Sequence, residues 1–420
     1  MRNNNQERTF RRDPGKLLSS AVMLFYFSAF LLLWLKDFAW QAAALAVAVP
    51  VMIWLGVNFL PRLFPADKLL LSLTNFLCAL GVLVLYATNP AYAYQQAVYY
   101  GVGLVAMVVC IYLVRVIKHW RIPVYLLMPV SLALLALPLI IGRETNGAKN
   151  WFYVGSLSVQ PSEIVKLSLL LIISHFMSRR KFLPWLIFAV GCLGLLMLQK
   201  DLGTALMYYG VTLMLYYASS SNLLLTGIGL AGGAGAAVLG YKMFAHVKRR
   251  VAIWQNPWSD YDNAGYQLVQ GLMAIASGGL FGVGLGLGSP RTIPVYHTDF
   301  IFAVICEQFG VIFGLCVLLM YVAIIWRGAT TAMAARTSFH GLLAMGATLM
   351  IGLQTFVIIG GVIKLIPLTG VTMPFVSYGG TSLVSSMCLI GLLQGVASLN
   401  EDDLDEDTRL AMLGSEEGMR

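Results

Sequence analysis

Charged residues are scarce in this sequence. Only 11% of its 420 residues are Asp, Glu, Lys or Arg, whereas 59% are hydrophobic. A soluble globular chain is about 25% charged and about 45–50% apolar. The small charged fraction therefore excludes a soluble enzyme and a disordered scaffold, and the apolar excess predicts a membrane protein.

Cysteine and histidine are also few. The six cysteines all lie in apolar stretches, which indicates small buried side chains and not a disulfide framework. The five histidines are scattered, and no HExxH or CxxC motif accompanies them, so the sequence predicts no zinc site. A GxSxG nucleophile elbow is missing as well.

The glycine-rich stretch 277–288 does not match a nucleotide-binding loop. It has neither the GxGxxG spacing nor a terminal GK[ST], and no strand precedes it. Glycine here is better explained by a tight, irregular backbone that approaches a ligand or a neighbouring helix.

Apolar runs predict an all-α polytopic membrane protein with about twelve transmembrane helices, because each span needs about 20 apolar residues. Residues 1–16 form a basic N-terminal segment, and no small-residue cleavage site follows the first run. We therefore expect a retained anchor and not a removed signal peptide. The runs lie at about 17–35, 39–60, 69–87, 95–114, 122–142, 161–177, 183–198, 203–218, 222–241, 299–326, 339–361 and 375–398.

Positive charge predicts the orientation of these spans. With the N-terminus in the cytoplasm, fifteen Lys and Arg fall on the cytoplasmic side and five in the short outer segments. This bias favours cytoplasmic N- and C-termini, and it explains the net charge of +9 without a nucleic-acid partner. Residues 400–420 form an acidic tail, which we expect to be a disordered cytoplasmic end.

A long outer loop, about 242–298, carries the first candidate site. In it, Arg249 and Arg250 precede Trp258, Asp260 and Asp262. Loops of this length are functional or disordered, and the aromatic content argues against disorder. Arginine binds phosphate oxygens in a fork geometry, and Trp favours the headgroup level. The loop could thus present a carboxylate to a lipid-linked polar substrate; the alternative is a solvated loop with interfacial anchors.

Several charged residues lie at membrane positions. Glu163 and Lys166 are three residues apart, which places both on one helical face. Asp201 lies between two apolar runs, Asp299 begins another, and Glu307 is two turns inside it. Such charges are costly and are functional by default, although structural pairs that hold the bundle together are an equal alternative.

Seven segments resemble one family, the SEDS proteins (shape, elongation, division and sporulation), which include FtsW, RodA and SpoVE. The resemblance runs from about residue 69 to 399 and implies a ten-helix core. Residues 17–60 would then be two additional N-terminal helices. The sequence departs from the family pattern at Asn150, Lys200 and Gln308, where the family has Arg, Pro and a second acid. The matching segments are 147–151, 160–163, 199–205, 256–267, 277–282, 297–303 and 374–382.

The resemblance implies a peptidoglycan glycosyltransferase of the bacterial cytoplasmic membrane. Such an enzyme polymerises lipid II onto a glycan carried by undecaprenyl diphosphate, at the outer face of the membrane, during elongation, division or sporulation. A class B penicillin-binding protein, which is a transpeptidase, would be its partner.

The family motif implies that Asp260 is the catalytic base. The positions expected to bind substrate are Lys149, Trp151, Arg249, Arg250, Trp258, Asp262, Tyr266, Gln267 and His297. Those expected to organise the bundle are Glu163, Lys166, Asp201, Asp299, Glu307 and Ser377.

The leaving diphosphate requires positive charge, which Lys149, Arg249, Arg250 or a divalent cation such as Mg²⁺ or Mn²⁺ would supply. Two other functions are compatible with a polytopic bundle that contains buried charges. One is a flippase for lipid-linked sugars, and the other is a non-catalytic scaffold for morphogenesis proteins.

Overall fold

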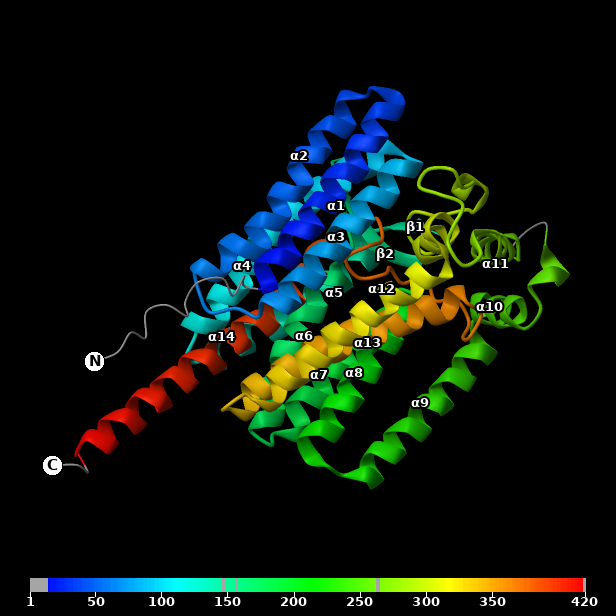
Figure 1. Cartoon of the computed structure of the whole chain (residues 1–420). Coiled ribbons are helices and arrows are strands. Elements are labelled where there is room, and N and C mark those ends of the chain that lie inside the picture. The colour runs from blue at the N-terminus through cyan, green and yellow to red at the C-terminus, as the bar shows by residue number, and fades with distance from the viewer. Residues whose placement is uncertain (1–13, 146–147, 156, 262–264, 418–420) are drawn as a thin grey trace, which may run out of the picture.

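The computed structural model describes residues 14–145, 148–155, 157–261 and 265–417. A helix covers each of the twelve apolar runs (Figure 1). These helices are α1 (Pro14–Asp37), α2 (Trp40–Trp54, continued by η1, Leu55–Phe59, and η2, Leu60–Arg62), α3 (Lys68–Thr88), α4 (Pro90–Val116), α5 (Arg121–Ile141), α6 (Pro161–Ser178), α7 (Phe182–Leu198), α8 (Leu202–Ser220), α9 (Leu223–Met243), α12 (Ile301–Met333), α13 (Ser338–Val362) and α14 (Gly380–Glu417).

The chain is a multi-pass membrane protein. Within the described ranges, ten helices are long and apolar enough to cross a membrane. Helix α7 is apolar but only 17 residues long, and α8 is not among the ten. The predicted helical membrane fold is confirmed, whereas the count of twelve spans is not.

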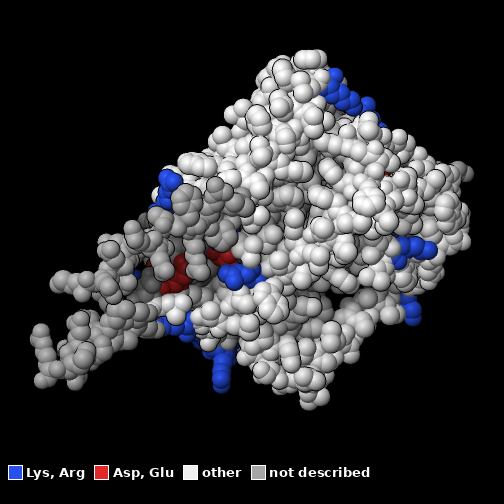
Figure 2. Space-filling view, in the orientation of Figure 1, with Lys and Arg blue, Asp and Glu red and all other residues white. Residues whose placement is uncertain are grey.

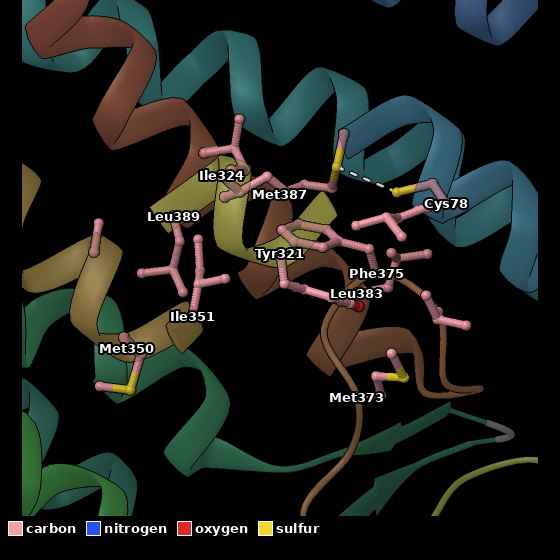
Figure 3. Packing of buried hydrophobic residues seen from close by; sticks show 14 of the residues in the cluster. Cys78, Tyr321, Ile324, Met350, Ile351, Met373, Phe375, Leu383, Met387 and Leu389 are labelled. Carbon is pink, nitrogen blue, oxygen red and sulfur yellow. Dashed lines mark hydrogen bonds between the residues drawn. The ribbon is translucent and has the colours of Figure 1, made fainter. Parts of the chain in front are cut away.

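The core lies where α3, α12, α13 and α14 meet. Figure 3 shows Tyr321 of α12 next to Phe375, with Met387 of α14 and Met350 of α13 in the same buried cluster. The Cys78 thiol of α3 donates a hydrogen bond to the Met387 sulfur over 3.7 Å. In contrast, α9 stands apart from this core (Figure 1), and its one buried residue is Gly240.

Helices α1 and α2 form a hairpin beside α3 (Figure 1). The Tyr26 hydroxyl donates to the Phe76 carbonyl oxygen of α3 over 2.8 Å. Gly56 lies so close to Asn75 that an added Cβ would come within 2.5 Å of that side chain. The hairpin therefore packs closely on α3.

Helix α14 continues beyond its apolar part as far as Glu417, so the expected disorder is wrong over residues 400–417. Asp402 pairs with Arg115 over 3.0 Å, and Asp403 pairs with Arg336 over 3.2 Å. The acidic residues follow the span without a proline, and the cations of α4 and of the α12–α13 turn lie beside them, which favours a continued helix.

A small sheet, which the sequence did not predict, joins α5 to α6. Its strands are β1 (Arg143–Thr145), β2 (Ala148–Val154) and β3 (Leu157–Val159), in antiparallel order β1-β2-β3. The Lys149 amide donates to the Gln199 carbonyl oxygen over 3.1 Å, which ties the sheet to the α7–α8 turn.

The long loop is folded, as its composition indicated. It contains α10 (Ala245–Gln255), η3 (Pro257–Asp260), α11 (Tyr266–Gly278) and η4 (Pro290–Thr292). Figure 2 shows one face of the molecule, on which the charged side chains lie toward the two ends and leave a broad uncharged area between them. That pattern is expected for a protein surrounded by lipid.

The glycine-rich stretch after α11 runs along a kink in α12. The Val283 amide donates to the Glu307 carbonyl oxygen over 2.9 Å, and the Gly284 amide to that of Gln308 over 3.0 Å. The kink is at Gly310, with φ 86° and ψ 165°. Gly282 has φ +82°, and an added Cβ would lie 2.3 Å from the Gln308 oxygen. Glycine thus permits a close approach to a neighbouring helix, as the sequence indicated.

Candidate active site

Asp260 lies at the end of η3, close to the start of α11. Its carboxylate is 3.8 Å from the Arg249 guanidinium of α10, and the Asp260 side chain is 39% exposed. The Gly265 amide donates to the Asp260 carbonyl oxygen over 2.9 Å, which closes the turn. Asp262, the second acid of this loop, lies outside the described residues.

Aromatic rings flank this carboxylate. Trp258 stacks on Tyr261 with ring centroids 6.0 Å apart, and Tyr266 meets Tyr261 edge-on at 5.7 Å. Trp258 is 62% exposed, so its ring is accessible to a ligand or to lipid headgroups. The side-chain amide of Gln267 donates to the Pro294 carbonyl oxygen over 3.2 Å.

Arg250 contacts a different segment of the chain than Arg249 does. It donates to the Thr369 carbonyl oxygen over 2.9 Å. A Cβ added to Gly370 would lie 3.7 Å from the Arg250 guanidinium and 3.8 Å from the Asp299 carboxylate. Arg250 and Asp299 therefore lie on either side of Gly370. Arg249 is close to the Asp260 carboxylate, and Arg250 is close to the Asp299 carboxylate.

Asp299 and Arg250 shift each other's pKa. Burial raises the pKa of Asp299 to about 6, and a hydrogen bond from Thr298 and the charge of Arg250 act in the opposite direction. Burial lowers the pKa of Arg250, whereas the carboxylates of Asp299 and Asp201 raise it. Asp201 thus belongs to the same electrostatic group.

Asp201 is fixed by three donors at the start of α8. The side-chain amides of Asn150 and Gln160 donate to it over 3.0 and 3.2 Å, and the Thr204 amide donates over 3.1 Å as a helix cap. Asn150 therefore binds this carboxylate where the family pattern has a cation. Trp151 follows on β2, opposite Arg143 of β1.

His297 and Ser377 hold two outer segments together. The His297 ring stacks on Tyr92 at 4.5 Å, and its carbonyl oxygen accepts from the Tyr378 amide over 2.9 Å. The Ser377 hydroxyl donates to the Thr298 carbonyl oxygen over 2.6 Å. Burial lowers the pKa of His297, which favours the neutral imidazole. Both residues thereby position Asp299.

The predicted Glu163–Lys166 pair forms inside the bundle, at 2.5 Å. The Ser385 hydroxyl donates to Glu163 over 2.6 Å. Lys166 also donates to the Gln354 amide oxygen over 3.4 Å, and the Gln354 amide nitrogen donates to the Thr372 carbonyl oxygen over 2.8 Å. Residues of three helices, α6, α13 and α14, and of the segment after α13 thus satisfy two buried charges.

Glu307 organises the glycine-rich stretch. One of its carboxylate oxygens accepts from the Ser289 amide over 2.9 Å. The other is buried and has no hydrogen-bond partner among the described residues. The side-chain amide of neighbouring Gln308 is likewise buried and without a partner in the described part of the chain.

Sequence reasoning missed three contributors. Gln354 was detectable, because it is an amide inside an otherwise apolar run. Ser385 resembles the many serines that only pack in helices, and the Thr369 carbonyl oxygen is a backbone group, so neither gives a sequence signal.

The described residues contain no group of three His, Cys, Asp or Glu placed to hold a metal ion. The two acids that share one environment, Asp201 and Asp299, both act on Arg250. The charge of the Arg250 guanidinium therefore compensates the charges of these two carboxylates.

Comparison with known proteins identifies the family. The family model described as cell cycle protein, FtsW/RodA/SpoVE, matches residues 67–402. The peptidoglycan glycosyltransferase RodA of Mycobacterium tuberculosis is 34% identical over 365 residues, which cover 79% of this chain and 78% of that protein. Stage V sporulation protein E of Bacillus subtilis is 32% identical over 362 residues, covering 79% and 96% respectively.

Solved structures support the same family assignment. A chain from a study of how a peptidoglycan synthase complex coordinates polymerisation and crosslinking superposes with a TM-score of 0.68 at 28% identity, over 80% of this chain and 98% of that one. The Thermus thermophilus rod shape determining protein RodA gives a TM-score of 0.60 at 29% identity, over 80% and 98%. With its motifs, its fold and its relatives in agreement, this chain belongs to the FtsW/RodA/SpoVE family.

Proposed function

We propose that this chain, which its family makes a peptidoglycan glycosyltransferase, polymerises lipid II and uses Asp260 as its catalytic base. The observation that carries the proposal is a half-exposed carboxylate 3.8 Å from a guanidinium, in a folded loop with accessible aromatic rings. A base that is accessible and lies beside a phosphate-binding group suits a substrate whose reacting sugar is attached to a diphosphate.

The reaction is a single inverting displacement. The Asp260 carboxylate takes the proton of the acceptor's sugar 4-hydroxyl, and the hydroxyl oxygen attacks the donor's anomeric carbon. The bond from that carbon to the diphosphate oxygen breaks, and undecaprenyl diphosphate leaves with the bonding electron pair. The loose, exposed pair between Arg249 and Asp260 lets Arg249 move onto the diphosphate and neutralise it.

An apolar cavity supports a polyprenyl substrate. It has a volume of about 490 Å³ and lies between α4, α5, α6 and α14. Its lining is apolar except for Ser131 and Ser168, whose hydroxyls hydrogen-bond each other at 2.6 Å. The Trp120 indole nitrogen, which also lines the cavity, has no hydrogen-bond partner among the described residues. The rest of the lining suits a hydrocarbon chain.

We also propose an orientation in the membrane and a partner protein. The excess of Lys and Arg at the end opposite Asp260 supports cytoplasmic termini and an outer-face reaction. A class B penicillin-binding protein as partner is supported by the resemblance to a chain whose study concerns the coordination of polymerisation and crosslinking.

Polymerisation of lipid II by purified protein tests the proposal. Asp260→Asn keeps the size of the side chain but removes the base, so the rate should fall about 10²–10⁴-fold. The matched control is Asp403→Asn, which removes an exposed carboxylate from the opposite end of the bundle and should polymerise at the wild-type rate.

Three results would contradict the proposal. Equal rates for Asp260→Asn and wild type would move the base elsewhere, with Asp262 the next residue to test. Wild-type protein that moves lipid II between leaflets without polymerising it would indicate a flippase, and protein with neither activity would indicate a scaffold.

A further inference from the structure

A second pocket lies at the opposite end of the bundle from Asp260. It has a volume of about 320 Å³ and is formed by the α6–α7 turn and the last turns of α8. Its position separates it from the glycosyltransferase site along the full length of the helices. Its lining includes Arg180, Phe182, Trp185, Tyr216, Ser219 and Ser220.

Three aromatic rings form one wall of this pocket. Phe182 meets Trp185 edge-on at 5.0 Å and Tyr216 at 6.1 Å, and Trp185 lies 5.9 Å from Tyr216. Trp185 is only 6% exposed, whereas Phe182 is 50% exposed. The wall therefore runs from a buried floor to an open rim, as an apolar chain entering from lipid requires.

A cation stands beside this wall. Arg180 lies two residues after the end of α6 and has a left-handed backbone with φ 55°, which turns the chain away from the helix. Arg179 and Lys181 flank it in the sequence. In the described ranges, none of these three cations takes part in an ion pair, and no carboxylate lines the pocket.

Two hydroxyls complete the lining. Ser219 and Ser220 donate to the Tyr216 carbonyl oxygen over 3.0 and 2.8 Å. Their protons are thus committed within α8, and the Ser219 oxygen keeps lone pairs that accept from a ligand hydroxyl.

We infer that this pocket binds an anionic phospholipid of the leaflet at this end of the bundle. The lipid phosphate lies on Arg180, and one acyl chain lies against Phe182 and Trp185. A polar headgroup and an apolar chain are both needed to satisfy a cation next to an aromatic wall. Basic pockets between helices at the membrane surface bind lipid headgroups by this combination.

Native mass spectrometry of the full chain in mixed micelles of detergent and phosphatidylglycerol tests the inference. Arg180→Gln should lower the retained phosphatidylglycerol about tenfold, because it removes a charge-assisted phosphate contact. The control is Lys181→Gln, an identical loss of charge one residue away that does not line the pocket. It should retain the lipid within about twofold of wild type, the size of a diffuse electrostatic effect.

Two further arms separate a lipid from a free phosphate. Phe182→Ala should weaken phosphatidylglycerol retention, and millimolar inorganic phosphate should not displace the lipid. Phosphatidylcholine, whose headgroup is zwitterionic, should be retained less than phosphatidylglycerol. All variants change exposed or half-exposed side chains, and unchanged thermal unfolding verifies their folding.

The inference fails under any of three results. Equal losses in Arg180→Gln and Lys181→Gln would show diffuse attraction to a basic surface. Unchanged retention in Phe182→Ala combined with displacement by inorganic phosphate would show a phosphate site. Equal retention of both lipids would show that charge is not recognised.

Discussion

Neighbouring residues on one short helix have different tasks in this protein. Arg249 and Arg250 are consecutive on α10 and therefore point about 100° apart. One approaches Asp260 at 3.8 Å, and the other donates to the Thr369 carbonyl oxygen over 2.9 Å. A sequence motif of two arginines predicts affinity for phosphate, but only the structure separates the accessible arginine from the one that anchors the loop.

The stability of the protein should depend on pH through Asp299, because burial raises the pKa of its carboxyl group from 3.8 to about 6. The folded protein then binds this proton more tightly than the unfolded chain does, so stability is lost as pH rises from 3.8 to about 6. At about 1.4 kcal/mol for each pKa unit, the loss is up to about 3 kcal/mol. Asp299→Asn removes this penalty.

Thermal unfolding in detergent measures the effect. The variant Asp299→Asn should match wild type near pH 4 and exceed it in melting temperature at pH 7.5. Asp403→Asn, which removes a carboxylate at the opposite end of the bundle, is the control for the loss of one negative charge. A constant difference between Asp299→Asn and wild type across this range would show that Asp299 titrates normally.

The charged contacts inside the bundle were only partly predictable. Spacing of three residues was enough to place Glu163 and Lys166 on one face, and they form the expected pair. Their partners Gln354 and Ser385 come from helices that lie about 190 and 220 positions later in the chain. No local pattern determines which distant helices pack together, so these contacts required the structure.

Among the secondary-structure elements, the long apolar helices were easier to predict than the short strands of the outer sheet. Each apolar run is long enough to mark a helix by composition alone. The strands β1 and β3 have three residues each, too few for an alternating pattern to be detected. The continuation of α14 depends on cations from other elements, which explains why an acidic composition alone gave the wrong expectation.

Where the glycine-rich stretch contacts α12, we expect one added methyl group to destabilise the protein. Gly282 has a positive φ and faces the Gln308 carbonyl oxygen, so Gly282→Ala should destabilise the protein by about 1–3 kcal/mol. Gly194→Ala is the control, because Gly194 lies within α7 and an added Cβ meets nothing within 4 Å. That change should be neutral or stabilise by about 0.5–1 kcal/mol.

Thermal unfolding and lipid II polymerisation of both variants provide the measurement. We expect Gly282→Ala to lose activity together with stability, because the stretch connects α11, next to the Asp260 loop, to α12. If Gly282→Ala were as stable as Gly194→Ala, the packing against the kink at Gly310 would not be a requirement of the fold.

At the scale of the whole molecule, we expect the catalytic core to work without the α1–α2 hairpin. The family match begins at residue 67, and we infer that the hairpin is an addition to a core that folds without it. Asn75, which the hairpin covers, keeps its partners in the core: it accepts from the Tyr100 hydroxyl, and its amide donates to the Leu71 carbonyl oxygen. Removing the hairpin therefore leaves no buried polar group unpaired on this face.

A chain that begins at Phe64 should consequently insert and polymerise lipid II at most of the wild-type rate. Removing two spans keeps the new N-terminus on the same side, so the orientation is preserved. Lipid replaces the apolar contacts of α3 at little cost, but the contact of Tyr26 with Phe76 is lost, which should lower the melting temperature. Polymerisation and thermal unfolding of the shortened and full chains compare the two effects. A shortened chain that is folded but inactive would show instead that the hairpin completes the active site, because Lys36 at its outer end reaches the glycine-rich stretch near Gly286.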